Sequence, residues 1–452
     1  MKIWAKEALT AEGWRKAVRV DIDAAGRIEA VTPNVPAEGT EVGVLLPSPA
    51  NLHSHAFQRA MAGMTERRGP DPRDTFWTWR QLMYRFLDHL TPDDVAAIAA
   101  LVQVEMLEAG YASVGEFHYL HHQTDGTPYD DIAEMAAAVI RAAGQTGIGL
   151  TLLPVAYQVG GCDGRALGQG QVRFGNDPER YARLHEASRA HLSALPPDAV
   201  IGVAPHSLRA VSPNGLKAVI KVAGDGPVHI HIAEQTAEVE ELLAHRDARP
   251  VEWLMANAEV GPHWCLIHAT HMTKEETFAV AESGAVAGLC PITECNLGDG
   301  IFNGVDFTRA GGRFGVGSDS NIRISLTEEL RVLEYSQRLR DRSRCQLAEG
   351  GSTGLALYQA AASGGAQAMG RQAGAIRPGA WADLVRLDDQ ARPFWGLTLD
   401  QMLDGWLFAG DDRVVADLWS AGRWMVRDGR HVARDAILPA FAQTMARLAG
   451  AL

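Results

Sequence analysis

Residues 42–55 read VGVLLPSPANLHSH, an apolar run that ends in two histidines, His53 and His55. In an extended chain alternate side chains point to the same face, so these two imidazoles would lie on one side, roughly 7 Å apart. Histidine nitrogens in this arrangement are typical ligands of one metal ion. A single histidine is more often a structural residue than a ligand, so a metal site requires further ligands elsewhere in the chain.

Composition predicts a globular protein of the cytoplasm. The chain has 452 residues, of which 46% are hydrophobic and 21% charged, which is enough to bury a large core. The net charge of −13 and the absence of a polybasic run argue against nucleic acid or a membrane as a partner. The start MKIWAKEALTAEGWRK has no apolar signal core, and no apolar stretch reaches the roughly 20 residues of a bilayer span.

The five cysteines are irregularly spaced, which argues against a disulfide framework and fits a reducing compartment. Cys290 and Cys295 lie close enough in sequence to suggest a zinc thiolate site. No CxxC motif accompanies them, and buried free thiols are therefore the favoured interpretation.

Strand-like apolar runs alternate with helix-like stretches through most of the chain. Eight strands are predicted, at residues 42–55, 112–120, 147–157, 199–207, 227–234, 263–271, 285–293 and 313–321. Segments such as 92–110 and 273–284 lie between them, with apolar residues at helical spacing, acidic starts and glycine ends. Eight strands with helical crossovers indicate an α/β fold, the (β/α)8 TIM barrel.

Both ends of the chain differ in character from this central part. Residues 1 to about 47 and about 377 to 432 show short alternating strands that are interrupted by Gly and Asp. The predicted division is a small β-sandwich domain with a C-terminal helix, from residues 1–47 plus 377–452, beside a barrel over residues 48–376.

Polar residues cluster where the predicted strands end. In a barrel these C-terminal ends converge on one mouth, where active sites are built. The residues are His53 and His55 at the first strand, His231 and Glu234 at the fifth, His268 at the sixth and Asp319 at the eighth. Three histidines with one carboxylate form a ligand set that zinc favours, although iron or manganese would also fit. His229 and His271 are interpreted as a packing residue and a loop residue.

This arrangement predicts a hydrolytic reaction. A metal ion lowers the pKa of a bound water to about 7, which makes that water a usable nucleophile. Asp319 and His268 can orient the water, and Glu234 can take its proton and deliver it to a departing nitrogen, as in a deamination. The alternative for Glu234 is a capping role at the following helix, since carboxylates are common near helix N-termini.

Arginines near the predicted mouth point to an acidic substrate. They are Arg80, Arg85, Arg209 and Arg323. Guanidinium groups bind carboxylates in bidentate fashion, so a small dicarboxylate would explain two such groups in an acidic protein. For any single one of them, a surface charge is the simpler explanation.

The sequence resembles the amidohydrolase superfamily over nearly its whole length. The resemblance rests on HSH in the first strand, HIHIAE in the fifth, HATH in the sixth, GSDSN in the eighth and RPGAWADLVRLD near the end. It implies a metal held by His53, His55, His231 and Asp319, with Glu234 and His268 working beside it. Members with two metals usually carry a bridging lysine from the fourth strand, where this chain reads APHS. We therefore predict one Zn²⁺ per chain, with Fe²⁺ or Mn²⁺ as alternatives.

At a finer level the sequence is similar to the formimidoylglutamate deiminase family, which converts N-formimino-L-glutamate and water to N-formyl-L-glutamate and ammonia in histidine degradation. The motifs are NLHSHAFQRAMAG, FWTWR, GEFHYLHH, APHSLRAVSP, HIHIAEQ and CPITECNLGDGIF. By this resemblance the substrate would be contacted by Gln58, Arg80, Tyr119, His206, Arg209 and Ser320. The family also implies a homodimer.

Two other functions stay open from the sequence. One is a related deaminase of the same superfamily, acting on guanine, an adenosine derivative or a triazine. The other is a scaffold on the same fold without catalysis, against which the intact set of predicted ligands weighs.

Overall fold

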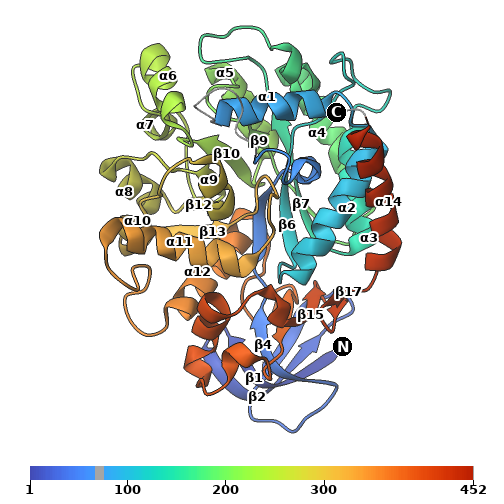
Figure 1. The fold of residues 1–452 in the computed structure, drawn as a ribbon, viewed down its shortest axis with the longest axis vertical. Coiled ribbons are helices and arrows are strands. Elements are labelled where there is room, and N and C mark those ends of the chain that lie inside the picture. The colour runs from blue at the N-terminus through green and yellow to red at the C-terminus, as the bar shows by residue number, and fades with distance from the viewer. Residues whose placement is uncertain (67–75, 451–452) are drawn as a thin grey trace.

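Parallel strands form the centre of the molecule, with helices around them (Figure 1). The computed structural model describes residues 1–66 and 76–450, and the side chains of residues 1–66 and 79–450. The central strands are β5 (Ala50–Ser54), β6 (Ser113–His118), β7 (Gly149–Ala156), β8 (Val200–Ile201), β9 (Ala204–Pro205), β10 (Val228–Ile232), β11 (Trp264–His268), β12 (Val286–Leu289) and β13 (Arg313–Val316).

Hydrogen bonds close these strands into a ring. One parallel sheet has the order β5-β6-β7-β8, with β9 beside β7, and a second has the order β10-β11-β12-β13. A bridge from Val203 to Val228 links the two sheets, and a bridge from Ser54 to Asp319 closes the ring. Each predicted strand segment contains a strand, the fourth as two short pieces, which confirms the α/β fold with a parallel barrel.

The prediction of a single strand at residues 42–55 is wrong, because these residues form two strands in two sheets. β4 (Thr40–Pro47) belongs to a flanking sheet, and β5 starts the barrel at Ala50. Pro47 and Pro49 lie at the break, and proline has no N–H to donate to a ladder. The apolar character of the whole run hid this change of sheet.

Several of the helices around the barrel begin at a residue whose side chain caps them. The helices are α1 (Phe76–Leu87), α2 (Pro92–Glu108), α3 (Glu134–Thr146), α4 (Pro178–Leu192), α5 (Pro213–Ala223), α6 (Thr236–Arg246), α7 (Pro250–Asn257), α8 (Lys274–Ser283), α9 (Pro291–Leu297), α10 (Gly304–Arg309), α11 (Leu326–Asp341) and α12 (Thr353–Ala368). Thr91 with Asp94 and Thr273 with Glu276 form capping boxes at α2 and α8. In the described part of the chain, we find no helix with the length and apolarity needed to cross a membrane.

Both chain ends form one eight-stranded sheet beside the barrel (Figure 1). Its order is β17-β16-β15-β14-β4-β1-β2-β3, with β1 (Lys2–Thr10), β2 (Gly13–Ile22), β3 (Ile28–Thr32), β14 (Leu384–Leu387), β15 (Val415–Ser420), β16 (Arg423–Arg427) and β17 (Arg430–His431). The antiparallel pair of β14 with β4 joins the two ends of the chain. This sheet confirms a β region built from both ends, and its packing as a sandwich stays a prediction.

The C-terminal helix leaves this sheet and packs on the barrel. α14 (Arg434–Ala449) lies beside α2, as Figure 1 shows. Ion pairs join Arg434 to Glu108 and Arg447 to Asp94 across the two helices.

The candidate active site

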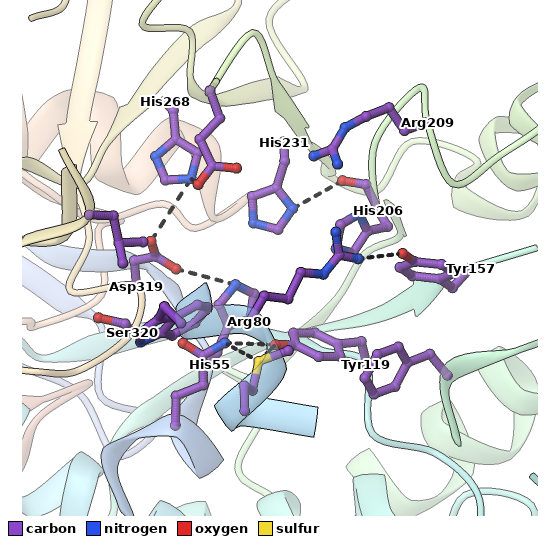
Figure 2. A pocket seen from close by; sticks show the side chains of 16 residues that line it. His55, Arg80, Tyr119, Tyr157, His206, Arg209, His231, His268, Asp319 and Ser320 are labelled. Carbon is purple, nitrogen blue, oxygen red and sulfur yellow. Dashed lines mark hydrogen bonds and ion pairs between the residues drawn. The ribbon is translucent and has the colours of Figure 1, made fainter. Parts of the chain in front are cut away.

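Nearly all of the predicted site residues line one cavity at the C-terminal ends of the barrel strands (Figure 2). We call it the mouth cavity, and the predicted residues in it are His55, Gln58, Arg80, Tyr119, His206, Arg209, His231, Glu234, His268, Asp319 and Ser320. His53 is fully buried, and its Nε2 lies 3.1 Å from Nε2 of His231. Residues from six strand ends or the loops after them therefore share one space, as the barrel topology predicts.

Four buried side chains form a group that could hold a metal ion. They are His53, His55, His231 and Asp319, and their ligand atoms lie within 4.8 Å of one another. Oδ1 of Asp319 is 3.4 Å from Nε2 of His53 and 3.2 Å from Nε2 of His55. The donors come from β5 and the residue after it, from β10 and from the segment after β13, so only the closed ring brings them together.

The protonation of these histidines fits a metal ligand set. Nδ1 of His55 and Nδ1 of His231 each lie 3.0 Å from a carbonyl oxygen, of Phe117 and His206 respectively. A carbonyl only accepts, so each Nδ1 donates its proton and each Nε2 presents a lone pair. Burial lowers the pKa of His53 to about 4 and the pKa of His55 to about 3, which keeps both neutral at pH 7. Lone pairs and a carboxylate this close repel one another unless a cation lies among them.

Asp319 is held in place by unusual backbone geometry. Its φ is 46°, in the left-handed region that non-glycine residues rarely adopt, and His268 has a φ of 68°. The Asp319 N–H donates to the carbonyl of His53, and the N–H of His55 donates to the carbonyl of Asp319, each at 2.9 Å. Strained backbone of this kind concentrates at functional sites.

The neighbouring histidines also set the pKa of Asp319. Burial alone would raise the pKa of Asp319, but His53, His55 and His268 hold it well below its usual range.

Glu234 and His268 form a second pair within the mouth cavity. Oε1 of Glu234 lies 3.8 Å from Nε2 of His268, and both side chains are buried. Burial raises the pKa of Glu234. Burial would lower the pKa of His268, but Glu234, Glu294 and Asp319 outweigh it and raise that pKa to about 10. The pair can therefore hold a proton beside the ligand group.

The capping alternative for Glu234 is wrong. α6 begins at Thr236, and its cap position is Gln235. The Glu234 carboxylate faces His268 instead.

Hydrogen-bonding side chains line the rest of the mouth cavity. Gln58 Nε2 donates to the Tyr119 hydroxyl at 2.6 Å, and Arg80 Nη2 donates to the Tyr157 hydroxyl at 2.8 Å. His206 is buried, and burial together with Arg80 and Arg209 holds its pKa well below the usual value. A neutral His206 can hydrogen-bond an anionic group without adding charge.

The structure separates the four candidate arginines. Arg80 and Arg209 line the mouth cavity, and Nη2 of Arg209 lies 4.0 Å from Oε2 of Glu238. Arg85 is exposed on α1, and Arg323 pairs with Glu328 in a separate groove. Only two of the four therefore reach the site.

Sequence reasoning missed several residues that line the mouth cavity: Trp79, Met83, Tyr157, Phe174 and Leu297. Tyr157 directly follows β7, so the strand-end rule that selected the histidines would also have selected it. The others come from α1, from the 3₁₀ segment η2 (Gln169–Phe174) and from α9, and no strand-end pattern marks them.

Two histidines near the predicted ligands make contacts of another kind. Nε2 of His229 lies 2.8 Å from the carbonyl oxygen of Ala368, and Nε2 of His271 lies 2.8 Å from that of Asp299. Neither histidine lines the mouth cavity.

Comparisons with known sequences identify two family models in the chain. Residues 44–425 match the amidohydrolase family, and residues 1–42 match "Formimidoylglutamate deiminase HutF, N-terminal domain". A formimidoylglutamate deiminase of Pseudomonas aeruginosa is 49% identical over 451 residues, which covers 99% of both chains. An 8-oxoguanine deaminase of the same organism is 28% identical, covering 85% of this chain and 83% of the relative.

Comparisons with solved structures agree with these sequence matches. An amidohydrolase from Brucella melitensis superposes with a TM-score of 0.95 at 50% identity, covering 99% of both chains. An adenosine deaminase from Xanthomonas campestris shares the fold, with a TM-score of 0.82 at 22% identity, over 99% of this chain and 98% of the other. The chain therefore belongs to the amidohydrolase family and, within it, to the formimidoylglutamate deiminases.

Proposed function

We propose that this protein hydrolyses N-formimino-L-glutamate to N-formyl-L-glutamate and ammonia. The observation that carries the proposal is that Arg80 and Arg209 share one cavity with Glu234 and the metal-ligand group. Two guanidinium groups suit a substrate with two carboxylates, and the reacting group would lie between them and the metal. The end-to-end similarity to the Pseudomonas aeruginosa formimidoylglutamate deiminase supports the same assignment.

We propose one Zn²⁺ per chain at the group of His53, His55, His231 and Asp319, with Fe²⁺ or Mn²⁺ as alternatives. The nitrogen and oxygen donors suit these ions. When bound, such an ion supplies a water of lowered pKa that is nucleophilic at neutral pH.

Glu234 is the proposed proton carrier. Water attacks the formimino carbon, a C–O bond forms, and Glu234 accepts a proton from the water. Glu234 delivers this proton to the terminal nitrogen, which gives a tetrahedral intermediate with an amino and a hydroxyl group. A second proton then passes from the hydroxyl through Glu234 to the same nitrogen, the C=O bond forms as the C–N bond breaks, and ammonia leaves with both hydrogens of the water. The raised pKa of Glu234 favours this role, because burial makes the carboxylate a stronger proton acceptor than an exposed one.

His268 and Asp319 would orient the attacking water. Nε2 of His268 lies 3.8 Å from Oε1 of Glu234 and 3.9 Å from Oδ2 of Asp319. We propose that the attacking water lies among these three groups. The remaining contacts to substrate are proposed for Gln58, Tyr119, His206 and Ser320, which line the same cavity.

Ammonia release tests the proposed function. Purified protein of measured metal content is given N-formimino-L-glutamate, with N-formimino-L-aspartate and guanine in parallel. Rapid release from the glutamate compound alone is expected, because the spacing of the two arginines selects the length of the dicarboxylate. Release from guanine alone would assign the chain to a purine deaminase and contradict the proposal.

Arg209→Met should raise KM strongly for N-formimino-L-glutamate. The variant removes one partner of a desolvated charge pair, which costs about 2–5 kcal/mol, or roughly 30-fold or more in kcat/KM. The matched control is Arg323→Met, since Arg323 lies in a separate groove. Steady-state kinetics of both variants check this, and an unchanged KM in Arg209→Met would place the carboxylate contact elsewhere.

Three features beyond the site belong to the same proposal. We propose a division into a barrel over residues 48–376 and a β domain from residues 1–47 plus 377–452, supported by the end of β4 at Pro47. The active form is a homodimer, and the protein works in the cytoplasm on a small dicarboxylate substrate.

A further inference from the structure

The segment CPITECNLGDGIF, residues 290–302, contains α9 and touches the candidate active site. The Thr293 hydroxyl oxygen lies 2.9 Å from the Ser320 hydroxyl oxygen. The N–H of Ile292 donates to Glu329 Oε2 at 2.9 Å, which fixes the first turn of α9 against α11. This turn is therefore held rigidly beside the strand ends that carry His268 and Asp319.

Glu294 reaches His268 from this rigid turn. Its Oε1 lies 3.2 Å from Nδ1 of His268 and accepts the N–H of Cys290 at 2.8 Å. His268 is 1% exposed and Glu294 is 6% exposed, so water does not compete for this contact. A buried carboxylate oxygen facing Nδ1 places the ring proton on that nitrogen.

The orientation of the His268 ring follows from this contact. With Nδ1 held by Glu294, the other nitrogen, Nε2, is turned to Glu234 and Asp319. We propose that Glu294 is a positioning residue that accepts the Nδ1–H of His268 and so holds the imidazole with its Nε2 directed at the reacting water. The kinetic part of this inference rests on the proposed function.

A metal ion at Glu294 is the competing explanation. His268, Cys290 and Glu294 also have ligand atoms within 4.8 Å of one another. The Glu294 oxygen already accepts the Cys290 N–H at 2.8 Å, so its contacts are explained by hydrogen bonds without an ion. The contact distance between Glu294 and His268 is that of a hydrogen bond.

Kinetics of three variants test the positioning role. Glu294→Ala should lower kcat about 10-fold to 100-fold with KM within about twofold, as is typical for residues that orient a functional histidine. Glu294→Gln, which retains an acceptor oxygen, should recover part of that loss. Glu329→Gln is the matched control, because Glu329 holds the same turn of α9 without contacting His268. It should keep kcat within about twofold.

A double variant distinguishes positioning from general damage to the fold. In a His268→Gln background, Glu294→Ala should cost less than about twofold more, because the group through which Glu294 acts is already gone. If the kcat losses of the two single variants instead multiply in the double variant, the proposal is overturned.

A readout without turnover keeps the inference separate from the proposed function. In zinc-loaded protein with ¹⁵N-labelled histidine, the His268 Nδ1–H signal is assigned by its loss in His268→Gln. The signal is expected in the native chain and should shift or exchange rapidly in Glu294→Ala. A proton-free Nδ1 in the native chain, or a second zinc ion per chain that is lost with Cys290→Ala, would overturn the proposal. A native chain that shows this signal but releases no ammonia would refute the proposed function alone.

Discussion

Glu234→Gln should remove nearly all turnover while the metal stays bound. Loss of a positioned general acid and base typically costs about 10²-fold to 10⁴-fold in kcat. The amide has nearly the same shape as the carboxyl but cannot carry a proton between water and the departing nitrogen. Glu234 is not part of the metal-ligand group, so the metal content should not change.

The measurement combines ammonia release with metal analysis of the same preparation. Glu329→Gln serves as the control, since it removes a buried carboxyl that does not line the mouth cavity. An unchanged KM in Glu234→Gln would show that substrate still binds. If this variant turns over at the native rate, Glu234 does not transfer the proton.

Removal of the metal should abolish activity, and Zn²⁺ should restore it. Activation of water and stabilisation of developing charge by a metal supply several kcal/mol, so the metal-free chain should lose about a thousandfold or more in rate. His231→Ala should bind no metal at this site and should not recover on addition of zinc, because its Nε2 belongs to the ligand group.

A neighbouring histidine on the same strand offers a close control for His231. His229 lies two residues earlier in β10 and contacts the carbonyl of Ala368 outside the mouth cavity. His229→Gln should retain one metal ion per chain and native turnover. Full activity in metal-free protein, or loss of metal in His229→Gln with retention in His231→Ala, would contradict the proposed ligand set.

Local sequence patterns were sufficient to predict the strands, the crossover helices and the positions of the histidines at the strand ends. Each strand shows a short apolar run, and α2 and α8 carry capping boxes that mark their starts. The barrel then places the ends of parallel strands at one mouth, so His231 and Asp319 could be grouped before any distance was known. The break after Pro47 was missed because both sides of it are buried strands.

Contacts between side chains from separate elements could not be predicted in this way. Four arginines looked alike in the sequence, and only the placement of α1 and of the loop after β9 turns Arg80 and Arg209 into the mouth cavity. Glu294 lies 26 residues from His268 in the chain, yet the two side chains meet.

The sequence by itself determined the α/β fold and the set of chemical groups, because strand periodicity and residue type are local properties. Only the tertiary structure decided which nitrogen of each histidine faces the ligand group and which charged side chains lie next to it. Burial in a closed ring sets those contacts, and it also sets the protonation of the groups, because a pKa depends on all the charges and on the solvent around a side chain.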